Sequence, residues 1–259
     1  MLRTVEATRY VTPLREGGSL PAVVEADDLG TYVLKFRGAG QGRKALIAEI
    51  VAGGIARSLG LLVPEIVLAN LDPKLARAEP DPEIQDLIRA SAGLNLALDY
   101  LPGSLGFDPL VEPPGADLAS RIVWFDALVT NVDRTPRNPN LLTWHNRLWL
   151  IDHGASLYFH HAWTGWEAAS KRPFAAARDH VLLPFAEAIA EADVALAPTL
   201  SDEVLHEIVD LVPEEWLKDE PGFADTAALR DAYVEFLSRR LDEPREWVRD
   251  LEVVRGQAV

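Results

Sequence analysis

The sequence predicts an α+β protein of two lobes: a small N-terminal lobe with an antiparallel sheet and one key helix, and a larger, mainly helical C-terminal lobe. Apolar residues first alternate with period two and then, from Lys44, recur with the spacing of a helix. The helix-breaking stretch Pro102-Gly103-Ser104 follows these segments, and helical periodicity dominates after it. We therefore expect an N-terminal lobe over residues 1–101 and a C-terminal lobe over residues 102–259.

The N-terminal lobe is expected to contain a β-hairpin followed by a long helix. Residues 21–25 and 31–36 are rich in strand-forming residues and flank the turn Asp27-Asp28-Leu29-Gly30. Apolar residues at helical spacing then predict a helix over residues 44–59, with Gly60 as its C-terminal stop. The predicted order of these elements is strand, strand, helix.

The rest of the chain divides into strands and helices by the same criteria. Two further strands, with a short helix between them, are predicted over residues 64–71, 95–101 and 83–92, respectively. After the break we expect one helix, two short strands and three helical segments, over residues 116–130, then 141–143 and 148–151, then 182–193, 201–217 and 226–241. A polar, turn-prone stretch, residues 131–140, connects the helix to the short hairpin.

The composition excludes several classes of protein. With 48% hydrophobic and 25% charged residues, the chain is of globular rather than disordered type. The absence of cysteine excludes disulfides, thiolate-ligated metals and thiol nucleophiles. A net charge of -15 disfavours direct binding of nucleic acid and stable association with membranes. The first residues lack the apolar core of a signal peptide, so we expect a cytoplasmic protein.

Basic residues gather at one place in this acidic chain. No acidic residue lies between Leu34 and Ala48, whereas four cations and three glycines do: Lys35, Arg37, Arg43 and Lys44, with Gly38, Gly40 and Gly42. Cations and flexible glycines ahead of a helix suit phosphate oxygens. The alternative is a solvated hairpin edge with a mobile loop. No Walker-type phosphate loop is present.

A second candidate feature is a lysine and glutamate pair. Lys35 lies in a predicted strand, in the middle of it and on the same face as Val33, and Glu49 interrupts an apolar helical face. A charge in such surroundings is costly unless it is paired. A pair between Lys35 and Glu49 would satisfy both groups and present the lysine to an anion. The alternative is two unrelated surface charges.

A third feature lies around the short hairpin, where oxygen-bearing side chains precede and follow the two strands: Asp133, Asn138, Asn140 and Asp152. Carboxylate and amide oxygens are ligands that Mg²⁺ accepts when nucleotide phosphates also hold it. Asp133, in a loop after a helix, could accept a proton from an incoming hydroxyl group. The alternative is that these residues only form turns and caps.

The order of these features along the chain resembles that of the protein-kinase-like fold. A strand lysine and a helix glutamate come first, followed by a loop aspartate, a loop asparagine, a hairpin and an Asp-x-Gly motif. Three segments resemble the HipA-like kinases more closely and, more distantly, the phosphatidylinositol 3- and 4-kinases: Gly30–Lys44, Asn131-Val-Asp-Arg134 and Ile151-Asp-His-Gly154. The resemblance covers residues 15–160. It implies a nucleotide bound between the two lobes.

The resemblance also implies roles for individual residues. Lys35 would contact the α- and β-phosphates of ATP and be held by Glu49. Asp133 would be the catalytic base or would orient the acceptor, and Asp152 would be the principal Mg²⁺ ligand. For the metal-binding asparagine, the kinase spacing of five after the aspartate selects Asn138, whereas a position directly before a Leu-Leu strand selects Asn140. We prefer Asn140, and Thr135-Pro136-Arg137 would then insert two residues.

Two further sites follow from the resemblance. Gly17, Gly18 and Ser19 lie where the family has its phosphate-covering loop, and Ser19 would be a site of autophosphorylation; the alternative is a plain flexible turn. Asp99, Tyr100 and Leu101 lie at the lobe junction, where the family's backbone receives adenine; the alternative is a buried strand.

The predicted function is therefore an ATP- and Mg²⁺-dependent phosphotransferase of HipA-like type, with serine or threonine of a protein substrate as acceptor. Three alternatives stay open: a nucleotide-binding pseudokinase or scaffold, a lipid or small-molecule kinase, and a metal-dependent phosphohydrolase that uses Asp133 and Asp152.

Overall fold

The computed structural model describes residues 1–14 and 20–258, and these form two compact units. The first unit consists of Met1–Ile47 and Pro64–Gly103, and the second of Ala48–Val63 and Ser104–Val259. Helix α1 (Arg43–Ser58) is therefore divided, because its residues from Ala48 onward group with the second unit. Its bounds, and the positive φ of Gly60 behind it, confirm the predicted helix and its C-terminal stop.

The first unit is a closed barrel of five strands in the order β1-β2-β3-β5-β4. The strands are β1 (Thr4–Pro13), β2 (Ala22–Ala26), β3 (Thr31–Lys35), β4 (Ile66–Leu71) and β5 (Gly93–Asp99). The predicted hairpin of β2 and β3 is confirmed, as are the strands β4 and β5.

The expectation of a purely antiparallel sheet is wrong at one pair. Strand β1 pairs parallel with β4, with Thr4 to Ala7 opposite Leu68 to Leu71. The sequence pattern does not predict β1, because Glu6 and Arg9 interrupt its few apolar positions. By pairing with β2 on its other side, β1 closes the barrel and leaves no open sheet edge.

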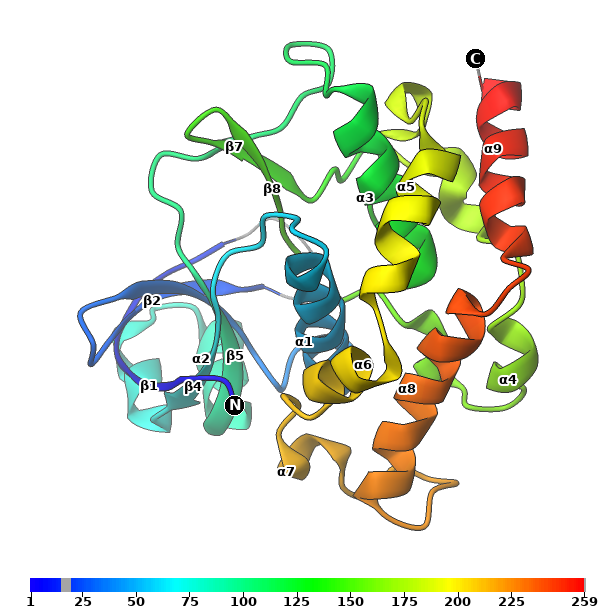
Figure 1. The fold of residues 1–259 in the computed structure, drawn as a ribbon. Helices are drawn as coiled ribbons and strands as arrows, with labels where there is room; N and C mark the ends of the chain where they lie inside the picture. The colour runs from blue at the N-terminus through cyan, green and yellow to red at the C-terminus, as the bar shows by residue number, and fades with distance from the viewer. Residues whose placement is uncertain (15–19, 259) are drawn as a thin grey trace. The chain divides into compact units, whose positions relative to one another are not determined.

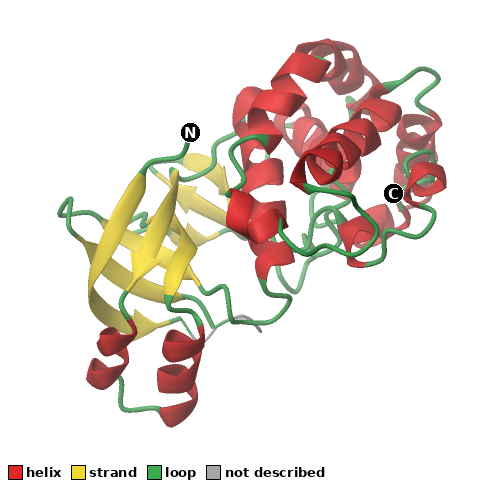
Figure 2. Cartoon of the chain, turned by 90° about the horizontal axis from the view of Figure 1, so that it is seen from below, coloured by secondary structure: helices red, strands yellow, loops and turns green. Residues whose placement is uncertain are grey.

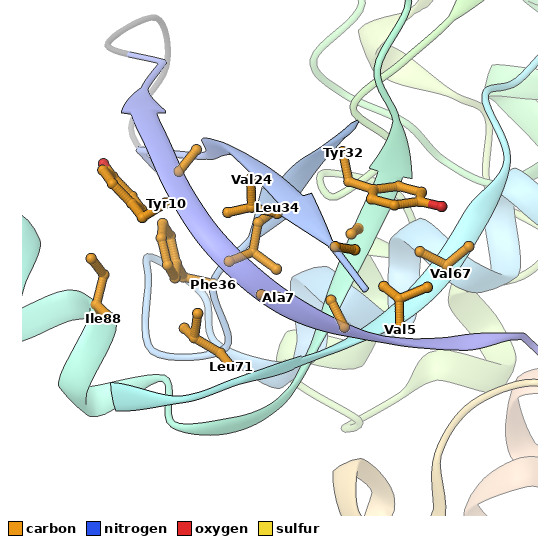
Figure 3. Close-up of a cluster of buried hydrophobic side chains, with 14 of the residues drawn as sticks. Val5, Ala7, Tyr10, Val24, Tyr32, Leu34, Phe36, Val67, Leu71 and Ile88 are labelled. Carbon is orange, nitrogen blue, oxygen red and sulfur yellow. The ribbon is translucent and has the colours of Figure 1, made fainter. Parts of the chain in front are cut away.

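Alternate residues of the strands point into the barrel and form its core. Figure 3 shows Val24, Leu34, Phe36 and Leu71 among the side chains gathered there, all of them buried. Complete burial of one such side chain stabilises the fold by about 1.5–3 kcal/mol. Because Leu34 faces inward, its neighbour Lys35 lies on the outer face of the barrel. Lys35 is the last residue of β3, so its predicted place in the middle of the strand is wrong.

Two short helices cover one part of the barrel core. They are the 3₁₀ helix η1 (Pro73–Ala78) and the helix α2 (Pro82–Ala90), and each begins with proline after a capping aspartate. The carboxylates of Asp72 and Asp81 accept hydrogen bonds from backbone N–H groups in the first turn of each helix. Ile84 and Ile88 of α2 belong to the buried cluster of the barrel.

The second unit is mainly helical, as the colouring by secondary structure in Figure 2 shows. Besides the larger part of α1, its elements are β6 (Leu105–Gly106), α3 (Ala116–Leu128), β7 (Leu141–Trp144), β8 (Arg147–Leu150), η2 (Tyr158–His161), α4 (Trp166–Ala169), η3 (Ala175–Asp179), η4 (Leu183–Phe185), α5 (Ile189–Leu196), η5 (Ala197–Thr199), α6 (Asp202–Val209), α7 (Glu214–Leu217), α8 (Thr226–Leu241) and α9 (Glu246–Ala258). Figure 1 labels the main ones.

The hairpin of β7 and β8 and the helices α3 and α8 confirm the predicted elements. The predicted helices over residues 182–193 and 201–217 are wrong in extent. The first is interrupted after η4, and the second after α6, where Pro213 lies before the short α7. Helix α9 was not predicted.

Helix α3 is the buried centre of the second unit. Its Trp124 ring lies 5.7 Å from that of Trp247 in α9, and its indole N–H donates to Asp193 of α5 at 2.8 Å. The same Asp193 carboxylate accepts from Arg245 at 2.8 Å. These contacts hold α3 against α5 and α9, just before the polar loop that follows it.

None of the helices in the described part of the chain combines the length and the apolar character that crossing a bilayer requires.

Candidate active site

The candidate active site is the loop from Asn131 to Asn140, between α3 and the hairpin of β7 and β8. The chain leaves α3 through Thr130, whose φ of 54° turns the backbone. The side chain of Asn131 is buried and joins two parts of this turn: its Nδ2 donates to Asp126 of α3 at 2.9 Å, and its Oδ1 accepts from the N–H of Asp133 at 3.1 Å. The backbone of Asp133 is thereby tied to α3.

Two asparagines hold Asp133. Its Oδ2 accepts from Nδ2 of Asn138 at 2.8 Å and of Asn140 at 3.4 Å. Asn140 also donates to the backbone carbonyl of Asp133 at 3.0 Å. A tight turn closed by Thr135 and Asn138, with two backbone hydrogen bonds of 3.1 Å, contains Pro136 and Arg137. Pro136 and Arg137 thus lie in the turn that places both asparagines beside Asp133.

Asn140 and Asp152 lie at the same end of the hairpin. Asn140 precedes β7 and Asp152 follows β8, in a register that pairs Leu141 with Leu150. The N–H of Ile151 donates to the carbonyl of Asn140 at 3.0 Å. Both Asn140 and Asp152 have left-handed backbone conformations, with φ of 50° and 54°. The antiparallel pairing therefore places Asn140 opposite Ile151, so that Asp152, twelve residues after Asn140, lies at the same end of the hairpin.

The electrostatics of Asp133 agree with this geometry. Its side chain is half-buried, and burial is the main cause that raises its pKa above the usual value. The hydrogen bond from Asn140 lowers the pKa, and the negative charge of Asp152 raises it again. The two carboxylates therefore interact, and Asp133 holds a proton more readily than an exposed aspartate.

The donor set fits a metal ion that arrives with other ligands. In the described residues, no three His, Cys, Asp or Glu side chains are grouped closely enough to hold a metal by themselves. Around Asp133 the donors are two carboxylates and the amides of Asn138 and Asn140. Such hard oxygen donors suit Mg²⁺ when phosphate oxygens complete its shell, and a protein cage for the ion alone is missing from this part of the chain.

A buried network that the sequence analysis missed supports the loop. Asp126 in α3 and Arg134 in the loop form a fully buried ion pair, and His180 contacts the same carboxylate at 2.9 Å. Burial opposes ionisation of Asp126, but the charge of Arg134 and the hydrogen bond of His180 outweigh it and hold the pKa well below its usual range. The available signal was the carboxylate of Asp126 within the apolar second half of α3.

Glu49 has a buried contact in its own unit. Its Oε1 lies 3.2 Å from Nδ1 of His153, and both side chains are fully buried. The predicted burial of Glu49 is confirmed. The sequence analysis assigned no role to His153, although His153 stands directly beside Asp152 in the Asp-x-Gly motif.

The remaining predicted residues belong to the first unit. Lys35 ends β3 on the outer face of the barrel. Asp99 is the last residue of β5; its N–H donates to Glu65 O at 2.9 Å, and that of Tyr100 donates to Thr31 O at 3.0 Å. Leu101 is buried. Gly17, Gly18 and Ser19 lie outside the described residues.

A loop aspartate held by asparagines after a helix, with a hairpin that ends in a second aspartate, is the arrangement expected of a phosphotransferase with a protein-kinase-like fold. The chain belongs to the HipA-like kinase family, whose model matches residues 8–249, and it is a kinase. This confirms the family resemblance of its motifs.

Solved structures agree on the fold. The Helicobacter pylori proinflammatory kinase CtkA aligns with a TM-score of 0.53 and 13% identity, over 96% of this chain and 98% of that one. A Golgi casein kinase aligns with a TM-score of 0.51 and 11% identity, over 99% of this chain and 73% of that one. At these identities the likeness shows the fold alone. No curated protein matches the sequence.

Proposed function

We propose that this kinase transfers the γ-phosphoryl group of ATP, with Mg²⁺, to the hydroxyl group of a serine or threonine on a protein. The observation that carries the proposal is the Asp133 carboxylate, held by Asn138 and Asn140 and raised in pKa by burial and by Asp152. A positioned carboxylate of this kind suits the orientation of an acceptor hydroxyl group and the acceptance of its proton.

Asp133 is the residue that acts on the acceptor. One of its oxygens, Oδ2, accepts hydrogen bonds from the amide nitrogens of both asparagines. These hydrogen bonds restrict rotation of the carboxylate. In phosphoryl transfer the protein contributes mainly by positioning and by neutralising charge. The fixed carboxylate therefore aligns the acceptor oxygen, and its raised pKa favours uptake of the proton.

Asp152 and Asn140 are the proposed metal ligands. They lie at one end of the β7–β8 hairpin, whereas Asn138 is exposed in the turn over Pro136 and Arg137. The amide nitrogen of Asn140 donates to Asp133, which leaves its amide oxygen for a cation. When bound, Mg²⁺ supplies neutralisation of the negative charge on the phosphates. With so few carboxylates, the site would hold the metal together with the nucleotide rather than alone.

Lys35 and Glu49 are proposed to serve the phosphates as the family resemblance implies. Lys35 would contact the α- and β-phosphates, and Glu49 would orient it. The outward position of Lys35 on the barrel and the complete burial of Glu49 support roles as a contacting and a supporting residue, respectively.

Adenine is proposed to bind at residues 99–101. The N–H groups of Asp99 and Tyr100 already donate to carbonyl groups of the barrel. The N–H of Leu101 is therefore the proposed donor to the adenine ring. Gly17 and Gly18 remain the proposed phosphate-covering residues, with Ser19 as a site of autophosphorylation.

A protein acceptor is preferred over a lipid headgroup. The net charge of -15 opposes approach to an anionic membrane surface. The chain also matches the HipA-like kinases, the family whose resemblance suggested a protein serine or threonine as acceptor. The name of the Golgi casein kinase, which shares the fold, also denotes a protein acceptor for that enzyme.

The test is incubation with labelled ATP and Mg²⁺, with casein and cell lysate as acceptors, followed by mass spectrometry. We expect the wild-type protein to label protein hydroxyl groups and both Asp133→Asn and Lys35→Met to lose this activity. Asp231→Asn is the matched control, because Asp231 is an exposed aspartate in α8.

Other results would contradict the proposal in distinct ways. Equal background rates in wild type and Asp133→Asn would indicate a nucleotide-binding scaffold. Release of inorganic phosphate that is unchanged in Lys35→Met would indicate a phosphohydrolase. Label on inositol lipid or a small molecule, and none on protein, would retain the kinase but reject the proposed acceptor.

A further inference from the structure

The carboxylate of Asp126 is the centre of a buried hydrogen-bond network. Oδ1 accepts from Nδ2 of Asn131 at 2.9 Å and from Nη2 of Arg134 at 3.3 Å. Oδ2 accepts from Nε of Arg134 at 2.5 Å and from Nε2 of His180 at 2.9 Å. Four donors from three residues therefore saturate one carboxylate that has no access to solvent.

Arg134 extends the network along the candidate catalytic loop. Its Nη1 donates to the backbone carbonyl of Asn140 at 2.6 Å, and its own carbonyl accepts from the N–H of Val181 at 3.0 Å. Asn131, Arg134 and Asn140 stand at the start, the middle and the end of the loop that contains Asp133. Asn131 and Arg134 therefore bond directly to Asp126, and Asn140 is connected to it through Arg134.

His180 is held at both ring nitrogens. Nδ1 accepts from the N–H of Leu182 at 3.0 Å, so this nitrogen has no proton. Nε2 therefore carries the proton and donates it to Asp126, which makes His180 a neutral donor. Because Asp126 and Arg134 already balance each other in charge, His180 adds a directional bond to the network without adding charge.

We propose that His180 is a positioning residue for phosphoryl transfer: it orients the Asp126 carboxylate, and through Arg134 this carboxylate sets the positions of Asp133 and Asn140. The inference rests on the proposed function for its catalytic readout only. His180 follows Asp152 by 28 residues, so the segment after the proposed metal ligand returns to support the loop before it. Without His180, Oδ2 of Asp126 loses one of its two donors, and the carboxylate can turn with Arg134.

The test compares His180→Phe, His180→Gln and a matched control, His160→Phe. Glutamine can still donate to Asp126, whereas phenylalanine cannot. His160 is also buried, and its Nδ1 lies 3.0 Å from the hydroxyl group of Tyr233. Its substitution therefore costs a comparable buried contact outside the Asp126 network.

The first readout is hydrogen exchange in peptides that cover residues 127–141, measured without nucleotide. We expect faster exchange in His180→Phe than in His160→Phe, with His180→Gln between His180→Phe and wild type. Equal exchange in His180→Phe and His160→Phe would overturn the inference. If His180→Phe does not fold, the ring tautomer of His180 in the wild-type protein, described below, decides the inference instead.

The second readout is steady-state transfer to casein. We expect kcat to fall about tenfold to a hundredfold in His180→Phe with little change in KM for ATP, and partial recovery in His180→Gln. A loss in His180→Gln as large as in His180→Phe would overturn the positioning role. An inactive wild-type protein would contradict the proposed function, while the exchange order would still test the network.

The third readout is the ring tautomer. In ¹⁵N-labelled wild-type protein, long-range NMR correlations of His180 are expected to place the proton on Nε2. A proton on Nδ1 in the folded protein would overturn the proposed donor to Asp126, whatever the activity.

Discussion

Nδ1 of His153 lies 3.2 Å from Oε1 of Glu49, and both side chains are fully buried. The two residues are 104 positions apart in the chain. With Glu49 ionised, its carboxylate can only accept, and Nδ1 of His153 is then the atom that carries the proton of the imidazole. The contact therefore connects helix α1 to the residue directly after Asp152.

The contact predicts a stability loss in His153→Phe. This change removes one donor from a buried carboxylate, and we expect the free energy of unfolding to fall by about 1–3 kcal/mol. Urea denaturation measures it. In Glu49→Leu the same substitution should cost less, because its partner is already absent. Equal costs in both backgrounds would contradict the contact. His206→Phe, at an exposed histidine, is the control and should change stability by less than about 0.5 kcal/mol.

The choice of metal-binding asparagine predicts unequal effects of two substitutions. Asn140→Ala should lower the transfer rate at limiting Mg²⁺ by about 10- to 100-fold, because it removes a proposed ligand. Asn138→Ala should have a smaller effect, because it removes only a hydrogen bond to Asp133. Rate measured against Mg²⁺ concentration distinguishes them. A larger loss in Asn138→Ala, with restoration by high Mg²⁺, would assign the metal to Asn138 instead.

We predict that the stability of the folded protein falls at acid pH because of Asp126. Its pKa in the folded protein lies well below the value of about 3.9 expected in the unfolded chain, so the ionised form is favoured by folding. This contribution is complete above about pH 4 and decreases as pH falls toward the lower, folded pKa. The midpoint of thermal unfolding should therefore decline more steeply below about pH 4 in wild type than in Asp126→Asn.

Asp126→Asn should also be less stable at neutral pH, by about 3–5 kcal/mol, because Arg134 loses its buried counter-charge. Asp231→Asn, at an exposed position, should retain the wild-type pH dependence. An acid profile of Asp126→Asn parallel to that of wild type would contradict the role of this carboxylate.

We predict that a side chain at position 54 disturbs the packing of α1 against α6. A Cβ atom there would stand 2.7 Å from Cγ2 of Ile208 in α6. Overpacking of this kind costs about 1–3 kcal/mol, which exceeds the gain in helix propensity of about 1 kcal/mol. Gly54→Ala should therefore destabilise the protein in chemical denaturation. In the Ile208→Ala background the same change should be neutral or stabilising.

Gly60→Ala is the matched control for this prediction. Gly60 has a φ of 75° and no atom within 4 Å of an added Cβ, so its substitution strains the backbone only. Ile208→Ala should leave that cost unchanged. A rescue of both alanine variants, or of neither, would reject the proposed contact between α1 and α6.

The local part of the fold could be predicted from the sequence. Period-two runs predicted β2 and β3, helical spacing predicted α1 and α3, and the Asp/Gly turn and Gly60 marked their limits. These features depend on neighbours a few residues apart, which is the range over which backbone preference and side-chain periodicity act. Strand β1 was missed, because its pairing with β4 depends on residues more than sixty positions away.

The candidate site, too, could be predicted from the sequence only in part. The motifs Asn-x-Asp-Arg and Asp-x-Gly and the asparagine before the Leu-Leu strand indicated Asp133, Asp152 and Asn140 through their resemblance to the HipA-like kinases, and the family is confirmed. The sequence by itself thus determined the class of enzyme and supplied the residues proposed to react. The buried contacts that support the proposed site, His180 with Asp126 and His153 with Glu49, were decided only by the tertiary structure. Burial makes such long-range polar contacts obligatory, yet any of several histidines could have supplied them, and only packing selects which one does.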